Sequence, residues 1–229
     1  MASYHAMIAL EHDMIGYCLT APRAQVLPTF GAEPKLGTNP IAYAVPTKDE
    51  PPYILDIATS VVAHNKINIA RRLGSVLPGG YVADMYGQPI MEDGPVPEEF
   101  QILPMGSIRE LGSHKGYGFA MMAEILATVL SGALPGMLDV ESRSSHHFAA
   151  YNISSFTDVE HFKDTMDYTL RTLRNTKPAR GFSRVLYPGL SEHEEEIERR
   201  ANGIPLHREV IEWFNKTTKE LSIPALQTF

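Results

Sequence analysis

The sequence predicts a mixed fold of helices and strands, of the α+β or α/β class. Two short apolar runs, residues 41–45 and 53–58, are separated by a polar turn that contains prolines, which is typical of neighbouring strands in a β-hairpin. Apolar residues fill residues 115–130 on nearly every helical face, and an amphipathic helical stripe follows Thr157. Strand-like and helix-like patterns therefore alternate along one chain.

The first two elements are a short helix and a buried strand. Residues 4–12 are typical of the end of a helix, and residues 14–20 of a strand that carries the single cysteine, Cys18. The helix begins without a capping residue or a preceding turn, so we expect an N-terminal part of the fold to be missing. A small residue in a buried strand is more typical of a core than of a nucleophile, and we interpret Cys18 as inert.

A helix and a long irregular segment follow the predicted hairpin. Ser60 is expected to cap a helix that runs to about Leu73, and Gly74 suits its C-terminal exit. Residues 78–112 are too rich in proline and glycine for long regular elements, and a loop of this length in a compact domain is usually functional. Residues 115–130 then predict a helix that is buried on all sides, because apolar side chains occupy nearly every face.

The last part of the chain predicts further strands and a final helix. Residues 147–153 and 184–187 are strand candidates, and residues 205–221 form the last helical segment. Between them lie two more helices, each of which is introduced by a capping-box pattern.

The first capping box pairs Thr157 with Glu160, ahead of an amphipathic helix. The second pairs Ser191 with Glu194, ahead of an acidic helix that runs to about Asn202. The carboxylates of that acidic helix are most simply a solvated face.

Composition excludes several classes of function. The 229 residues carry a formal net charge of -7 and a pI of about 5.7, whereas a nucleic-acid-binding protein needs a basic face. No apolar run approaches the roughly 20 residues of a membrane-spanning helix. A single cysteine excludes an internal disulfide and a thiolate-cage metal site. We therefore expect an acidic, cytoplasmic protein that binds neither nucleic acid nor a membrane.

The start of the helix at residues 115–130 is a candidate anion site. The segment Ser113-His114-Lys115-Gly116 would place backbone N–H groups and the positive end of the helix dipole beside a lysine. This combination predicts a pocket for a phosphate or a carboxylate. The alternative is a solvated lysine and a hydrogen-bonded histidine beside an ordinary helix start.

A second candidate is the turn at residues 56–60, which joins a strand to a helix. Asp56 could accept a hydrogen bond from a ribose hydroxyl, and Thr59 and Ser60 could donate to a phosphate. The residues alone favour the alternative, in which Thr59 and Ser60 cap the helix.

The turn Gly37-Thr38-Asn39-Pro40 has a similar ambiguity. The Asn39 side chain either holds its own backbone or reaches a substrate.

Common nucleotide and metal motifs are absent from the sequence. No G-x-G-x-x-G follows a strand and no P-loop is present, and Gly116-Tyr117-Gly118 is only a fragment of such a pattern. His146 and His147 are adjacent in a predicted strand, so their side chains point to opposite faces and do not chelate one ion together. We expect no metal site.

Four short motifs occur in order along the chain. They are Gly37-Thr38-Asn39-Pro40-Ile41-Ala42, Leu55-Asp56-Ile57-Ala58-Thr59-Ser60, His114-Lys115-Gly116-Tyr117-Gly118 and Tyr187-Pro188-Gly189. Together they resemble the malate/L-lactate dehydrogenase family of the non-Rossmann type. That family includes ureidoglycolate, sulfolactate and diketogulonate dehydrogenases and imine reductases that act on cyclic amino acids, and the resemblance covers essentially the whole chain.

The resemblance implies a fold, a reaction and a set of contacts. The fold is a mostly antiparallel sheet flanked by helices, like that of sulfolactate dehydrogenase. The reaction is the interconversion of a 2-hydroxy acid and a 2-oxo acid with NAD or NADP, in a homodimer. Thr38 and Asn39 would lie near the nicotinamide and the substrate. The contacts to the cofactor would fall on Asp56, Ile57, Ala58, Thr59, Ser60, His114, Lys115, Pro188 and Gly189.

The resemblance also implies a division of the chain and a missing group. Residues 1–176 would form the cofactor-binding sheet domain, and residues 177–229 would add a strand and helices that pack back on it. The catalytic histidine of the family would precede Met1, and hydride transfer to a carbonyl needs such a proton donor. We therefore expect a fragment with little or no activity alone. The alternative is a non-catalytic nucleotide-binding subunit that pairs with a separate N-terminal chain.

Overall fold

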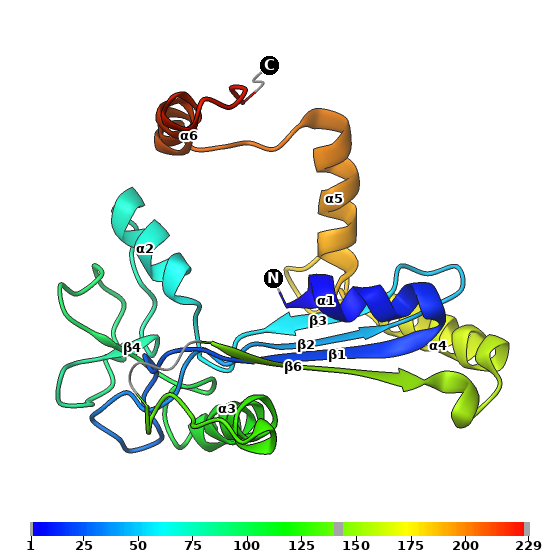
Figure 1. The fold of residues 1–229 in the computed structure, drawn as a ribbon, viewed down its shortest axis with the longest axis horizontal. Helices are drawn as coiled ribbons and strands as arrows, with labels where there is room; N and C mark the ends of the chain where they lie inside the picture. The colour runs from blue at the N-terminus through cyan, green and yellow to red at the C-terminus, as the bar shows by residue number, and fades with distance from the viewer. Residues whose placement is uncertain (1, 140–143, 227–229) are drawn as a thin grey trace. The chain divides into compact units, whose positions relative to one another are not determined.

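The computed structural model describes residues 2–139 and 144–226, which divide into two compact units, Met1–Leu190 and Ser191–Phe229 (Figure 1). Within the first unit, Tyr187 and Leu190 pack into a small core with Leu170. Its elements, with two further helices in the C-terminal part of the chain, are α1 Ser3–Met7, η1 Ile8–His12, β1 Met14–Ala21, β2 Ile41–Val45, β3 Tyr53–Ile57, α2 His64–Leu73, β4 Val82–Ala83, β5 Gln101–Ile102, α3 Ser113–Ala127, η2 Val129–Ser131, β6 Ser145–Asn152, η3 Ile153–Ser155, α4 Val159–Arg174, α5 Leu190–Asn202 and α6 Arg208–Leu221.

The centre of the first unit is a four-stranded antiparallel sheet in the order β3-β2-β1-β6. The predicted hairpin of residues 41–45 and 53–58 is confirmed as β2 and β3, with Ile41 opposite Ile57 and Val45 opposite Tyr53. β6 returns from far along the chain to pair with the whole length of β1. This sheet confirms the expected fold class of a mostly antiparallel sheet flanked by helices.

Small residues on one face of the sheet allow helix α1 to approach closely (Figure 1). Ala6 of α1 packs with Cys18, Ala42 and Ala44 in a core of small side chains. A Cβ atom at Gly16 would overlap the carbonyl group of Ala6, so the two backbones are in direct contact there. Cys18 is buried, as predicted, and burial raises the pKa of its thiol, with the charge of Asp56 adding to the shift.

Helix α3 covers the opposite face of the sheet, where Ala123 packs against Leu19 and Ile41 (Figure 1). The prediction that this helix is buried on all sides was wrong. Phe119 and Ile125 are 45% and 48% exposed, because α3 meets the sheet and a second core with only part of its circumference. The buried side of the helix consists mostly of small residues, which let it lie close to its neighbours.

The irregular segment predicted at residues 78–112 is folded around a second core rather than being loose. Only two short strands interrupt it, β4 and β5, which pair with each other. Buried apolar side chains from the loops, from α2 and from α3 make up this core: Val26, Leu36, Val62, Ile67, Leu77, Val82, Ile102 and Ala120. The segment therefore has a defined path, and it delivers Met105 to the start of α3.

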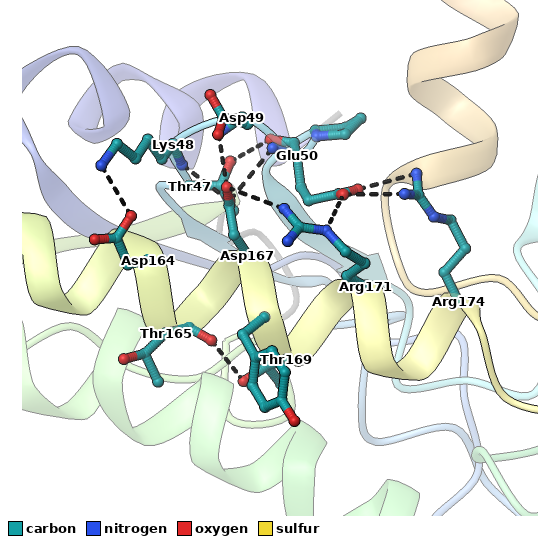
Figure 2. Close-up of polar contacts among 12 residues, drawn as sticks. Thr47, Lys48, Asp49, Glu50, Asp164, Thr165, Asp167, Thr169, Arg171 and Arg174 are labelled. Carbon is teal, nitrogen blue, oxygen red and sulfur yellow. Dashed lines mark hydrogen bonds and ion pairs between the residues drawn. The ribbon is translucent and has the colours of Figure 1, made fainter.

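Helix α4 is fixed to the turn between β2 and β3 by one buried carboxylate (Figure 2). Asp167 accepts hydrogen bonds from the backbone N–H groups of Lys48, Asp49 and Glu50 at 2.9–3.3 Å. Burial alone would raise the pKa of the Asp167 carboxyl, but the three N–H donors and the charge of Arg171 outweigh it, and the net shift is downward.

Glu50 reinforces the same connection. Its side chain, which is almost fully buried, pairs with Arg171 at 3.2 Å and with Arg174 at 3.0 Å (Figure 2). The turn and the helix are therefore joined by two carboxylates. Asp167 of α4 binds the backbone of the turn, and Glu50 of the turn binds two arginines of α4.

Several predicted helix starts and one predicted strand differ from the structure. α2 begins at His64, not near Ser60, and the Ser60 hydroxyl donates to the carbonyl of Val62 instead of capping. The predicted exit at Gly74 is confirmed, since this residue adopts the left-handed conformation with φ of 60°. Residues 184–187 form no strand.

The two capping-box predictions were wrong in their details. Asp158, rather than Thr157, caps α4 by accepting from the N–H of His161 at 2.8 Å. α5 begins at Leu190, so Ser191 lies inside the helix and its hydroxyl bonds Glu192. Among residues 2–139 and 144–226, no helix combines the length and apolar character needed to cross a membrane.

Candidate functional site

Two of the predicted site segments are joined directly. The backbone N–H of Thr59 donates to the carbonyl of Thr38 at 2.8 Å, and the Thr59 hydroxyl donates to the same oxygen at 3.1 Å. The interpretation of Thr59 and Ser60 as helix caps is therefore wrong, because both hydroxyls bond elsewhere and α2 begins later. The end of β3 and the turn before β2 form one buried junction.

Met105 connects this junction to the start of α3. Its backbone N–H donates to the carbonyl of Thr59 at 2.8 Å. On its other side it contacts Gly116, where an added Cβ atom would overlap the backbone of Met105. Three predicted segments, at residues 37–40, 56–60 and 113–116, are therefore linked through Thr59 and the backbone of Met105, a residue that no sequence motif singled out.

The first turn of α3 has the features of an anion site. Gly112 occupies its N-cap position, and no side chain caps the helix. The side chain of Lys115 runs back over Gly112, with Nζ 3.7 Å from where a Cβ atom of that glycine would lie. Within the part of the chain that the structure describes, Lys115 makes no ion pair, so its charge adds to the positive end of the helix dipole.

Arg109 is a second cation at this end of the helix. Its Nη1 lies 2.9 Å from Nδ1 of His114. Because a guanidinium only donates hydrogen bonds, His114 accepts this one through Nδ1, which leaves Nε2–H as a donor. No sequence pattern singled out Arg109, because it lies in the irregular segment, away from any motif.

A cavity of about 280 Å³ opens beside the same helix start. It is smaller than most ligand pockets, which are about 300–1,000 Å³, but it is lined by convergent polar groups. Among these, Thr29 and Ser113 bond each other through their hydroxyls at 3.0 Å, and Arg109 and Ser107 stand at the same wall.

Asn39 is turned inward. Its Nδ2 donates to Oε1 of Glu124 at 2.8 Å and, more weakly, to the carbonyl of Thr20 at 3.4 Å. The interpretation that Asn39 holds its own turn is therefore wrong. Its backbone has a positive φ of 30°, which asparagine tolerates better than most residues.

Asp56 lies within β3, and the segment Pro188-Gly189 contacts the same strand at Ile54. Oδ2 of Asp56 accepts from the backbone N–H of Ser3 at 2.9 Å, and the residue is exposed. The carbonyl of Pro188 accepts from the N–H of Ile54 at 3.1 Å, and Gly189, with φ of 95°, lies so close to Ile54 that no other residue fits well.

Of the predicted cofactor residues, Asp56 and Ile57 lie in β3, and Ala58, Thr59 and Ser60 directly follow it. Ile54 and Thr59 are separated by roughly 16 Å, at about 3.3 Å per residue. Ile57 and Ala58 lie between them and are half-buried. An extended ligand that follows β3 would meet the Pro188-Gly189 turn at one end and the start of α3 at the other.

The adjacent histidines have separate environments. His146 bonds Oγ1 of Thr20 at 2.9 Å, and the ring of His147 lies against Tyr17 on the other face of the sheet. Apart from the residues left undescribed, no group of three histidine, cysteine or carboxylate side chains is arranged to hold a metal ion.

The chain is similar to known enzymes over most of its length. The family model described as malate/L-lactate dehydrogenase matches residues 1–215. Malate dehydrogenase from Pyrococcus abyssi is 35% identical over 233 residues, which cover 99% of this chain and 64% of that protein. Malate/(S)-sulfolactate dehydrogenase from Methanothermus fervidus is 32% identical over 231 residues, 97% of this chain and 64% of that protein. The chain therefore spans about 64% of the length of these curated relatives.

Solved structures have the same fold. Malate dehydrogenase from Entamoeba histolytica superposes with a TM-score of 0.90 at 30% identity, covering 99% of this chain and 66% of that one. Sulfolactate dehydrogenase from Methanocaldococcus jannaschii superposes with a TM-score of 0.80 at 30% identity, covering 97% of this chain and 64% of that one. Sequence, fold and the order of the four motifs agree, and the chain belongs to the malate/L-lactate dehydrogenase family.

Proposed function

We propose that this chain provides the cofactor site of an NAD- or NADP-dependent dehydrogenase that interconverts a 2-hydroxy acid and a 2-oxo acid. The observation that carries the proposal is the junction of Thr38, Thr59 and the start of α3 around Met105. Relatives named for malate and for sulfolactate, both 2-hydroxy acids, support the substrate class.

The residues of the chain fit a dinucleotide in the chemistry of their donors. Lys115 and Arg109 supply positive charge beside the N-terminus of α3, where a pyrophosphate would be held. Nε2–H of His114 and the free Oδ1 of Asp56 can donate to and accept from hydroxyl groups of a ribose. The cofactor supplies the hydride that reduces the carbonyl of a 2-oxo acid.

The turn at Thr38 and Asn39 would lie beside the nicotinamide and the substrate. A protein group must also deliver a proton to the oxygen that becomes a hydroxyl, and no residue of this chain is assigned to that role. We therefore expect cofactor binding by the chain alone, with little or no turnover.

An alternative is a nucleotide-binding subunit that works with a separate chain. The curated relatives are longer than this chain, and this difference in length supports the alternative. In that case the cofactor site is the same, but activity appears only when a second polypeptide supplies the proton donor.

We further propose that the chain forms a homodimer. The exposed apolar side chains of α3, Phe119 and Ile125 among them, support this, because a second copy that covers them would remove apolar surface from water.

A fluorescence titration of the purified chain with NADH and NADPH tests the proposal. We expect binding that Lys115→Ala weakens about tenfold or more, since a hydrogen bond to a charged group contributes about 1.5–3 kcal/mol. Lys177→Ala is the matched control, because this lysine is exposed and follows α4. A folded chain that binds neither nucleotide would overturn the proposal.

Turnover tests the expectation that the chain alone has little or no activity. Oxaloacetate, pyruvate and related 2-oxo acids are assayed with each reduced cofactor, first with the chain alone. Robust turnover would contradict our expectation that the proton donor lies elsewhere, while binding without turnover agrees with it.

A further inference from the structure

Glu124 is a carboxylic acid in a fully buried position. It is 1% exposed, its partner Asn39 is 0% exposed, and one hydrogen bond joins them, from Asn39 Nδ2 to Glu124 Oε1 at 2.8 Å. The two remaining oxygens, Oε2 of Glu124 and Oδ1 of Asn39, are buried and have no hydrogen-bond partner.

Two buried acceptors without a donor are costly. A buried polar atom left without a hydrogen bond destabilises the fold, and a buried charge without a partner destabilises it more. Protonation of Glu124 supplies the missing hydrogen-bond donor, because a protonated carboxyl is both a donor and an acceptor. A primary amide is its complement, so an acid and an amide can pair through two hydrogen bonds.

No cation near Glu124 would stabilise the charged form. Burial raises the pKa of its carboxyl and the bond from Asn39 only partly opposes that rise, with no charged side chain among the contributing groups. The strands packed against α3 are β1 and β6, and their titratable side chains are Tyr17, Cys18, His146, His147 and Tyr151. Tyr17 donates to a methionine sulfur, His146 bonds Thr20, and His147 lies against the Tyr17 ring.

We propose that Glu124 is protonated in the folded chain and forms a two-bond acid–amide pair with Asn39, so that it acts as a positioning residue for the turn at residues 37–40. The proton on Oε2 of Glu124 is donated to Oδ1 of Asn39, while Nδ2 of Asn39 donates to Oε1. The pair fixes the Asn39 amide, and with it a backbone held at positive φ.

The role in function rests on the proposed cofactor site. Asn39 follows Thr38, whose carbonyl accepts both hydrogen bonds from Thr59. A turn that loses its anchor at Asn39 would move that carbonyl and loosen the junction on which the cofactor site depends. Glu124 itself touches no ligand in this arrangement.

Infrared spectroscopy tests the protonation directly. At pH 7.5 the exposed carboxylates are ionised, whereas a protonated carboxyl retains its C=O stretching band. We expect this band in the native chain and its loss in Glu124→Gln. A native chain without the band at pH 6 to 8 would overturn the proposal, and this measurement on the native chain needs no variant.

Two substitutions test the positioning role. Glu124→Gln keeps one donor and one acceptor in the places of the acid, so we expect the melting temperature to stay within about 2 °C of the native value. Glu124→Ala leaves the buried Asn39 amide with only its weaker bond to the carbonyl of Thr20, and we expect a fall of about 5 °C or more. A glutamine variant as unstable as the alanine variant would contradict the acid–amide pair.

Nucleotide affinity completes the test. We expect Glu124→Gln to bind NADH about as tightly as the native chain, and Glu124→Ala to bind about tenfold more weakly. Equal affinities of all three would contradict the positioning role. If the native chain binds no nucleotide, the proposed cofactor site fails, while the infrared and melting results still decide the state of Glu124.

Discussion

The backbone N–H of Thr59 and its side-chain hydroxyl both donate to the carbonyl of Thr38, at 2.8 and 3.1 Å. The two residues are 21 positions apart in the sequence. Thr59 is 1% exposed, and its own carbonyl accepts from Met105. One threonine therefore holds together the turn before β2, the end of β3 and the segment that leads into α3.

Replacing Thr59 with valine should loosen this junction while keeping its shape. We expect Thr59→Val to lower the free energy of unfolding by about 1 kcal/mol, the usual net contribution of a buried hydrogen bond, and to weaken NADH binding. Urea denaturation and the fluorescence titration measure the two effects. Thr172→Val is the control, because that hydroxyl bonds its own helix at an exposed position. Equal losses in the two variants would argue against a special role for Thr59.

Two glycines of α3 should respond to alanine with opposite signs. A Cβ atom at Gly116 would overlap the backbone of Met105, so Gly116→Ala must displace the helix and should cost about 1–3 kcal/mol. At Gly118 nothing lies within 4 Å, and Gly118→Ala should stabilise the chain by about 0.5–1 kcal/mol through helix propensity. Thermal melts of the two variants decide this, and a stable Gly116→Ala would contradict the close contact with Met105.

The strands of the four-stranded sheet were predictable because their signals are local and strong. Apolar runs bounded by turn residues identified β2 and β3, and the left-handed glycine at Gly74 ended α2 where expected. Helix starts were less predictable, because serine, threonine and aspartate all cap helices and often stand side by side. Thr157 and Asp158 are such neighbours, and only the structure shows that Asp158 bonds the N–H of His161.

Sequence motifs selected the segments of the candidate site, but they did not indicate how those segments are connected. The resemblance of the four motifs suggested which segments bind the cofactor, whereas the backbone contacts of Met105 leave no signal in a sequence. Glu124 did leave one, since it is the only carboxylate within the apolar residues 115–130. A charged residue in such a run predicts a buried partner, although it does not say that the partner is Asn39.

Asp167 should make the stability of the chain depend on acidity. Its pKa is lowered in the folded state, so its contribution is complete above the unfolded value of about 3.9 and is lost as the pH falls through the lower folded value. We expect Asp167→Asn to lower the free energy of unfolding by about 1–3 kcal/mol at pH 6, because an NH₂ group would face a backbone N–H donor. The gap between native chain and variant should shrink below about pH 4.

Urea denaturation across pH 3 to 7 measures this gap, and Asp164→Asn is the matched control. Asp164 lies on the same helix but is exposed, and its bond to Lys48 is a surface pair of the kind that contributes about 0–1 kcal/mol (Figure 2). A constant gap for Asp167→Asn down to pH 3 would show that its carboxylate does not carry the predicted charge-dependent contribution.

The exposed apolar side of α3 should mediate association of the chain. Ile125 is 48% exposed on this side, so a charge there would oppose burial between two copies. We expect the native chain to sediment as a dimer and Ile125→Lys to shift it towards the monomer. Ile69→Lys is the control, since Ile69 on α2 is 51% exposed and should leave the dimer intact. If both variants dissociate equally, the surface that joins the copies is not specific to α3. A native chain that sediments as a monomer at high concentration would exclude the dimer, and the apolar side of α3 would then need another partner.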